Sequence, residues 1–399
     1  MTLTLAALGM IGPFTINTVF PAFTRIGDEF GASDVVLQQL ISVYLAAFAV
    51  MSVFHGPLSD ALGRKRVMLT GLVIYIAAML GAVFADSMGM LIVLRALQGM
   101  SAGAATIVSR VVVRDLFEGP AAQRLMAQVM MIFAVSPVVA PMLGGWLLLL
   151  GDWRWVFAGV GLYGVAVLVA TALMPESLPR EARIPLRLGS VLGALWDVGR
   201  SPVLIRIALA TAFGFAAHFV FVAAAPIIVV RLLGLGEQDF WVLFGPLIIG
   251  MIAGSWVVAR AAEAMERSRL ITLGFMGTLA MSVVNLVLVS TFPDPSGQLD
   301  ASLLPVLVGP MLMSFTASLF FAPMQLEILD LFTHQRGAAA SLGTFFTLIM
   351  NALLSGVIAP LITGSLTVVA LAALGYVVVG CLLWAWHLAD QRRRAAVPA

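Results

Sequence analysis

The chain has 399 residues, of which 61% are hydrophobic and only 11% are charged. Soluble globular domains are about 45–50% apolar and about 25% charged, so this composition excludes a soluble enzyme, a disordered chain and a nucleic-acid-binding domain. Cys381 is the only cysteine, which excludes a disulfide scaffold.

Stretches without Asp, Glu, Lys or Arg recur along the chain, for example over 1–24, 35–58 and 125–151. Each is as long as the roughly 17–25 residues that cross a bilayer as a helix. The sequence therefore predicts an all-α integral membrane protein with twelve transmembrane helices. We expect these spans at about 3–23, 36–58, 67–85, 89–112, 124–149, 155–174, 203–229, 240–260, 270–291, 304–327, 338–362 and 366–388.

The placement of the basic residues predicts the orientation of the chain in the membrane. If both termini are cytoplasmic, eighteen of the 22 Lys and Arg residues lie on the cytoplasmic side. Only Arg25, Arg154 and Arg231 lie on the opposite side, and Arg95 lies within a span. This asymmetry predicts a multi-pass protein of a bacterial cytoplasmic (inner) membrane with both termini in the cytoplasm.

One long loop rich in Arg and Pro divides the spans into two groups of six. We expect an N-terminal half over 1–174, a cytoplasmic linker over 175–202, a C-terminal half over 203–390 and a basic tail over 391–399. Two echoes between the halves support this division. Residues 136–143 resemble 355–362, and a loop pattern recurs 203 residues later, as Asp60, Arg64, Arg66 and Gly71 and then as Glu263, Arg267, Arg269 and Gly274.

The loop between the second and third spans combines two glycines, an acid and three bases. We expect Gly56 to let a neighbouring helix approach closely and Gly63 to take a positive φ in a tight turn. Asp60 and Arg64 are predicted to form an ion pair at the cytoplasmic edge that acts as a gate. The alternative is that Arg64, Lys65 and Arg66 are only a positive-inside anchor.

Three further motifs follow this loop: Leu94–Gly99, Arg110–Phe117 and Ala140–Gly145. Together with the loop, they resemble the major facilitator superfamily, and in particular the bicyclomycin and chloramphenicol resistance type of drug:proton antiporters. The likeness is dense over 13–178 and thin in the C-terminal half. It implies two pseudo-symmetric six-helix halves and a polyspecific exporter that works by alternating access and uses the proton gradient. It also implies a conformational role for Arg110 and Arg114.

The predicted fifth span contains Pro137 and Pro141, each of which removes a backbone donor and kinks a helix. We expect Gly144 and Gly145 to permit close packing across the interface between the halves. A helix of this kind can rock between two arrangements. The alternative is a static kink.

Asn17 marks a departure from the pattern of these exporters. The resemblance implies an acid in the first span shortly before a proline, and Asn17 stands in that place before Pro21. An amide cannot take up and release a proton near neutral pH, although it can hydrogen-bond a substrate.

Four residues are candidates for proton coupling, because no Asp or Glu lies in the middle of a predicted span. His218, near the middle of the seventh span, titrates in the useful range, unless it is only a packing residue. Glu327 is the best acidic candidate, unless it is simply solvated, and Asp34 either titrates or only favours the start of its helix. Arg95 either faces a cavity and tunes a protonatable group or extends to the lipid headgroups.

Polar, aromatic and methionine side chains within spans are candidates for lining a substrate cavity. They are Asn17, Gln38, Tyr44, Gln98, Phe219, Phe320, Phe321, Met324, Gln325 and Asn351. Because few acids are buried, such a cavity suits neutral or anionic, moderately apolar solutes better than strong cations.

We therefore expect a secondary active transporter that exports small, moderately apolar solutes or drugs in exchange for protons. Its expected partners are a small-molecule substrate and the lipid bilayer, with no nucleic acid, and a monomer is the expected working unit. No metal or other cofactor is expected, because the proton gradient supplies the energy. An uncoupled facilitator or a nutrient symporter of the same fold is the alternative. A membrane-embedded enzyme or receptor is less favoured, because the four His residues are scattered.

Overall fold

The structure is a computed structural model that describes residues 2–116, 135–261, 264–291, 303–332, 335–362 and 364–395. In these ranges all regular secondary structure is helical. The chain divides into two compact units. Unit 1 comprises Met1–Leu188 and Glu237–Trp241, and unit 2 comprises Gly189–Gly236 and Val242–Ala399.

Eleven helices of the described ranges are long and apolar enough to cross a membrane, and each coincides with one of the predicted spans. The remaining prediction, 124–149, is described only as the helix Val135–Leu148, and its first part lies outside the described residues. The all-α membrane architecture expected from the sequence is therefore confirmed.

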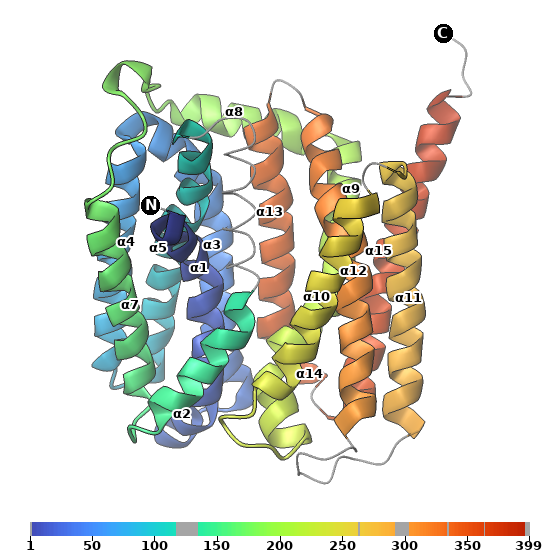
Figure 1. Ribbon diagram of the computed structural model, residues 1–399, viewed down its shortest axis with the longest axis horizontal. Helices are drawn as coiled ribbons and strands as arrows, with labels where there is room; N and C mark the ends of the chain where they lie inside the picture. The colour runs from blue at the N-terminus through green and yellow to red at the C-terminus, as the bar shows by residue number, and fades with distance from the viewer. Residues whose placement is uncertain are drawn as a thin grey trace. The chain divides into compact units, whose positions relative to one another are not determined.

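Unit 1 is built around α5. Its helices are α1 (Thr2–Thr18), η1 (Phe20–Ala22), α2 (Phe23–Phe30), α3 (Asp34–Leu62), α4 (Arg64–Val83), α5 (Met88–Leu116), the helix Val135–Leu148, α7 (Arg154–Ala172) and η2 (Arg180–Ala182). Helix α5 packs against α3, α4 and α1, and α7 packs against α4 (Figure 1).

Local chemistry fixes where these helices begin and end. Asp34 opens α3 directly after Ser33, as predicted, and an acid there favours the helix N-terminus. Gly63 separates α3 from α4 with a φ of 99°, which confirms the predicted tight turn. The first span continues beyond its predicted end through η1 and α2, until Gly31 ends α2 in the left-handed region.

Unit 2 contains α8 (Leu188–Gly199), α9 (Pro202–Ala223), η3 (Ile227–Leu232), α10 (Trp241–Ala261), α11 (Arg267–Thr291), α12 (Leu304–Asp330), α13 (Arg336–Leu353), η5 (Leu354–Ile358), α14 (Ala359–Leu361) and α15 (Leu366–Ala395). Helix α11 packs against α12, and α9 packs against α15 and α13 (Figure 1). Two predicted spans are interrupted: the seventh ends as the π-helix η3, and the eleventh passes through the π-helix η5. The predicted linker is not all loop, because α8 lies in it.

The two units repeat an ion pair in corresponding places. At the start of α4, Arg64 Nε lies 3.0 Å from Asp115 Oδ2, near the end of α5. At the start of α11, 203 residues after Arg64, Arg267 Nη1 lies 2.5 Å from Asp330 Oδ2, at the end of α12. In the other predicted echo, between residues 136–143 and 355–362, the corresponding Ser136 and Ser355 are both fully buried.

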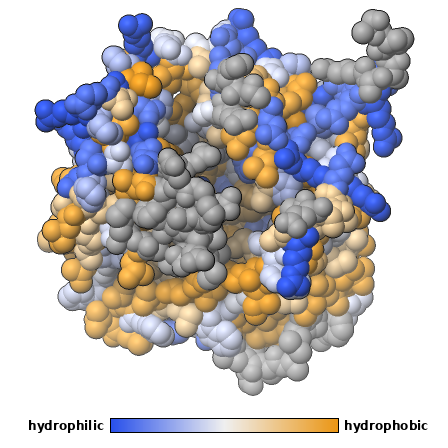
Figure 2. Space-filling view, turned by 45° about the horizontal axis from the view of Figure 1, so that its top comes forward, coloured by the Kyte–Doolittle hydropathy of each residue, from blue (hydrophilic) through white to orange (hydrophobic). Residues whose placement is uncertain are grey.

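Large apolar side chains stay exposed on the helices of both units, for example Leu162 (70%), Ile249 (62%) and Leu382 (65%). Such side chains are costly in water and favourable against lipid tails. Figure 2 shows hydrophilic residues gathered toward its upper part, with hydrophobic residues more abundant lower on the visible face. Exposed apolar side chains of this kind are expected of helices that face lipid.

Candidate functional site

A buried arginine lies in unit 1. Arg95, on α5, has no exposed surface. Its Nε donates to Leu40 O on α3 (2.9 Å), and its Nη1 donates to Gln98 Oε1 (3.0 Å) and Thr15 O on α1 (3.5 Å). Its guanidinium lies over the ring of Tyr44, 4.6 Å from the centroid, in cation–π geometry.

The surroundings of Arg95 decide one of the alternatives from the sequence. Extension to the lipid headgroups is wrong, because the side chain is enclosed between α1, α3 and α5. Within the described part of the chain, no carboxylate forms an ion pair with Arg95. The proposed tuning of a protonatable group stays a prediction.

Tyr44 and Gln98 share this network with Arg95. Both are fully buried; Tyr44 OH donates to Gly12 O (3.2 Å), and Gln98 Nε2 donates to Ala78 O on α4 (3.1 Å). Tyr75, which was not predicted as a site residue, also belongs to this network, with its hydroxyl 2.5 Å from Thr15 Oγ1. The sequence could have indicated Tyr75, because a tyrosine within an apolar span needs a hydrogen-bond partner for its hydroxyl.

Gly99 fixes the spacing of α3 and α5 beside Arg95. A Cβ on Gly99 would lie 2.9 Å from the Tyr44 carbonyl carbon and 3.0 Å from Tyr44 Cα, and closer still to Tyr44 O. Only glycine permits this backbone approach, so the last residue of the motif Leu94–Gly99 sets the distance over which Arg95 reaches Leu40 and Tyr44.

Asn17 and Gln38 are also buried in unit 1, at 4% and 1% exposure. Asn17 Nδ2 donates to Pro13 O (2.8 Å), within its own helix. Asn17 Oδ1 is buried and has no hydrogen-bond partner among the described residues. The position at which the sequence resemblance implies an acid thus holds an amide whose oxygen has no partner among the described residues.

The proline and glycine pairs of the fifth span lie in the helix Val135–Leu148. A Cβ on Gly144 would meet Thr18 O and Pro21, and a Cβ on Gly145 would lie 2.7 Å from Glu237 O. The Gly144 contacts lie within the predicted N-terminal half, whereas Gly145 approaches Glu237, which belongs to the predicted C-terminal half and is counted with unit 1 in the structure. Rocking at Pro137 and Pro141 stays a prediction.

The predicted ion pair of the gate is present in unit 1. Arg64 Nη1 lies 2.5 Å from Asp60 Oδ1 and donates to Ser59 Oγ (2.6 Å), while Nε donates to Asp115 Oδ2 (3.0 Å). Arg64 is nearly buried, with 8% of its side chain exposed. One arginine therefore joins the end of α3 to the end of α5. Its action as a gate stays a prediction.

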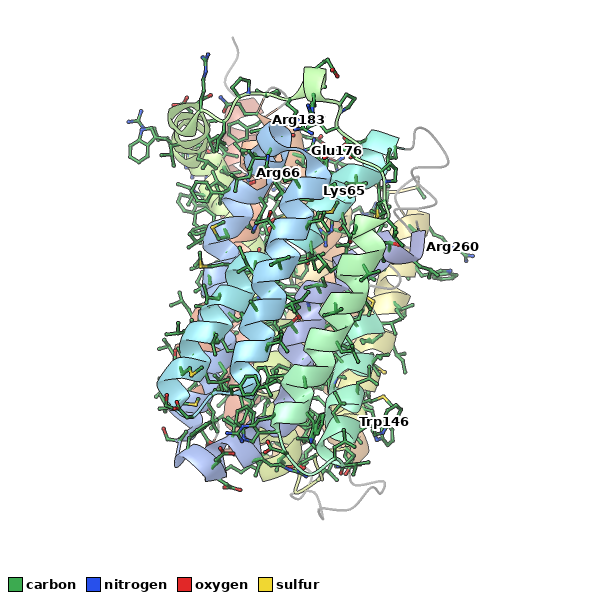
Figure 3. All side chains as sticks on the ribbon, turned by 90° about the vertical axis from the view of Figure 1, so that its left-hand side faces the viewer. Lys65, Arg66, Trp146, Glu176, Arg183 and Arg260 are labelled. Atoms are coloured by element: carbon green, nitrogen blue, oxygen red, sulfur yellow. The ribbon has the colours of Figure 1, made fainter. Side chains whose placement is uncertain are left out.

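Glu176 completes this cluster and was missed by the sequence analysis. Its Oε1 accepts from the backbone N–H groups of Arg64 (3.0 Å) and Lys65 (3.4 Å), at the start of α4. A carboxylate there satisfies unpaired donors and opposes the positive end of the helix dipole. Glu176 also pairs with Arg183 (3.7 Å), and Figure 3 shows both beside Lys65 and Arg66 at one end of unit 1, with Trp146 toward the other.

Three other residues were predicted to take part in the gate or in conformational change, and the structure treats each of them differently. Gly56 does not support a close helix approach, because a Cβ there would meet no atom within 4 Å. Arg110 is partly buried on α5. Arg114 also lies on α5, but its side chain is outside the described residues.

Two of the three arginines predicted for the opposite side hold unit 1 together there. Arg25 on α2 forms an ion pair with Glu237 (2.7 Å) and donates to Leu148 O (2.9 Å). Arg154 pairs with Glu29 (2.7 Å) and donates to Ala85 O (3.0 Å). These contacts hold together segments of unit 1 that lie at the ends of different helices.

His218 lies in unit 2, on α9, with 7% of its surface exposed. Its Nδ1 lies 2.8 Å from Ser314 Oγ on α12, and Ser314 Oγ donates to Pro310 O (2.8 Å). Since a hydroxyl carries one hydrogen, Ser314 accepts from Nδ1–H, and Nε2 is left as the nitrogen that can take a proton. Phe215 lies beside the ring, 5.4 Å between centroids.

The aromatic candidates near His218 separate into two groups. Phe219 and Phe321 are partly buried; Phe219 stacks with Phe215, and Phe321 lies tilted against it with 4.4 Å between ring centroids. Phe320 and Met324 were expected to line a cavity, but they lie in the hydrophobic core of unit 2 with no exposed surface. Phe320 stacks on Phe275 (4.3 Å), so its role here is packing.

The acidic candidates occupy helix ends. Glu327 Oε2 lies 3.4 Å from Arg267 Nη1, in the ion-pair cluster that repeats that of unit 1. This contact favours a structural role for Glu327 over proton transfer. Asp34 begins α3. Gln325 is partly buried on α12, and Asn351 is 4% exposed on α13 with no partner for Oδ1 in the described ranges.

Comparison with known proteins places this chain among transporters. The family model described as Major Facilitator Superfamily matches residues 5–353. The chain is 28% identical over 344 residues to "Multidrug resistance protein D" of Escherichia coli (strain K12), covering 86% of this chain and 84% of that protein. It is 28% identical over 271 residues to a bicyclomycin resistance protein homolog of Haemophilus influenzae, covering 66% and 68%.

The fold agrees with a solved transporter. The inward open xylose transporter XylE from E. coli superposes with a TM-score of 0.74 at 14% identity, over 97% of this chain and 95% of that chain. The expectation of a non-enzymatic membrane transporter is confirmed by these comparisons. The chain belongs to the Major Facilitator Superfamily of bacterial multi-pass membrane transporters.

Proposed function

We propose that the protein exports small, moderately apolar solutes or drugs across the bacterial cytoplasmic membrane by alternating access. The observation that carries this proposal is the 28% identity over 86% of the chain to a protein named for multidrug resistance. The proposed orientation has both termini in the cytoplasm, and the eighteen-to-three placement of basic residues supports it. A monomer in lipid, without a metal or other cofactor, is the proposed working unit.

We further propose that export is exchanged for protons and that His218 carries the proton. Two features support His218 over the acidic candidates. Ser314 accepts from Nδ1–H whether or not Nε2 is protonated, so the ring keeps its position in both states. Glu327, by contrast, is held by Arg267, and the first span carries Asn17 where an acid would be expected.

Transport into proteoliposomes tests the proton step. With the purified protein, an imposed pH gradient is expected to accelerate uptake of an exported drug. His218→Gln is expected to leave downhill exchange intact but to abolish this acceleration, because glutamine cannot bind a proton. His387→Gln is the matched control, since His387 is also buried in unit 2, with 1% of its surface exposed. If transport by the unaltered protein does not respond to the pH gradient, the antiporter proposal is overturned in favour of a facilitator.

Asn17→Asp tests the role of the first span. The variant places a carboxylate at a 4% exposed position whose present oxygen has no partner in the described part of the chain, so we expect a stronger dependence of transport on pH. Asn351→Asp is the control, because Asn351 is also 4% exposed and also has a partnerless oxygen among the described residues. If both variants change the pH profile equally, the first span has no special role.

A further inference from the structure

The charge of Arg95 sets it apart from the other buried arginines of the described chain. Arg64, Arg95 and Arg206 are the three with less than a tenth of their surface exposed. Arg64 pairs with two carboxylates, and Arg206 Nη2 lies 2.7 Å from Asp390 Oδ2. Arg95 alone among them has carbonyl and amide oxygens and a ring face as its partners, so its positive charge is not neutralised.

The hydrogen-bond donors of Arg95 that have no acceptor indicate what kind of group could bind there. A guanidinium has five N–H donors. Nε supplies one to Leu40, and Nη1 supplies two to Gln98 and Thr15. Nη2 is buried and has no hydrogen-bond acceptor among the described residues. A buried donor without a partner is costly, and a buried charge without a counter-charge is more so.

We infer that Arg95 is the anchor for the carboxylate of an organic anion, and that aromatic carboxylates are a substrate class of this transporter. This inference rests on the proposed export function and adds the class of solute. The two N–H groups of Nη2 can donate to a carboxylate oxygen, and the negative charge of the carboxylate would neutralise the guanidinium. Tyr44 and Phe48, whose ring centroids lie 6.4 Å apart, supply aromatic surface on the adjacent α3.

The fixed part of the network would position the anchor without competing with the ligand. Leu40 O, Gln98 and the Tyr44 ring hold Nε, Nη1 and the guanidinium face, so Nη2 is the end that remains for an anion. Because Nη2 is enclosed between α1, α3 and α5, the inference requires these helices to separate locally before a carboxylate can reach it.

Binding of a matched pair of probes to the purified protein tests the inference. 1-Naphthoate and 1-naphthamide differ in charge but hardly in shape. We expect the protein to bind the naphthoate about tenfold tighter or better than the amide, and Arg95→Gln to abolish this preference. Arg95→Lys keeps the charge but loses the guanidinium that Leu40, Gln98 and Tyr44 hold in place, so it is expected to retain only part of the preference. Inorganic phosphate at the same concentration is expected not to displace naphthoate; displacement would assign the site to free anions.

The control is the double variant Arg206→Gln/Asp390→Asn, which removes a buried arginine together with its carboxylate and is expected to keep the preference. Equal binding of both probes, or a preference that survives Arg95→Gln in protein that elutes as folded, would overturn the inference. If neutral drugs are still exported in that case, the proposed function stands. If naphthoate binds through Arg95 but no solute is transported, the proposed function falls instead.

Discussion

Gly99→Leu is expected to destabilise unit 1 by about 3 kcal/mol and to abolish transport. A Cβ at this position would overlap the backbone of Tyr44, which cannot rotate away as a side chain can. Helices α3 and α5 would have to separate, and Arg95 would lose its contacts with Leu40 and Tyr44. Thermal or denaturant unfolding of the purified protein in detergent measures the first effect, and proteoliposome uptake measures the second.

Gly89→Leu is the matched control for this prediction. Gly89 lies on the same helix, but a Cβ there would meet no atom within 4 Å. We expect its free energy of unfolding to change by no more than about 0.5 kcal/mol. Equal loss of stability in the two variants would mean that any leucine on α5 is harmful and that the approach to Tyr44 is not the cause.

Arg64→Ala is expected to lower the free energy of unfolding by about 3 kcal/mol and to stop transport. The side chain is only 8% exposed, and its removal leaves Asp115 and Asp60 without their counter-charge. The ends of α3 and α5 would then carry two carboxylates with no bridge between them. Denaturant unfolding in detergent and drug uptake into proteoliposomes give the two readouts.

Arg267→Ala gives the comparison within the same chain. Arg267 occupies the corresponding place in unit 2, but 39% of its side chain is exposed, as is 56% of Asp330. Solvent screens such a pair, so we expect a loss of only about 0–1 kcal/mol. If both variants lose the same stability, burial does not set the strength of these ion pairs.

Much of the fold could be predicted because the bilayer imposes simple rules. A span must be apolar and long enough to satisfy its own backbone, so composition alone located eleven helices that the structure contains. Short-range rules also held: Gly63 takes a positive φ, and Asp60 pairs with Arg64 one turn away. The π-helical segments of two spans were not predicted, because η3 and η5 have the same apolar composition as α-helix.

The candidate site was harder to predict because it depends on contacts between distant segments. Glu176 caps α4 from 112 residues away, and Ser314 reaches His218 across 96 residues. No local pattern gives the rotation of one helix against another. The same limit explains Phe320 and Met324, whose residue types suit a cavity wall as well as the core in which they lie.

The sequence by itself determined that this chain is a helical membrane transporter, because hydrophobic length, charge placement and short motifs are local properties. Only the tertiary structure decided that Arg95 is enclosed with carbonyl oxygens and a tyrosine ring instead of reaching the headgroups. It also decided that Glu327 is held by Arg267. The physical reason is that the free energy of a buried charge depends on the groups that surround it. Those groups come from different helices, so only the packing of the helices determines which they are.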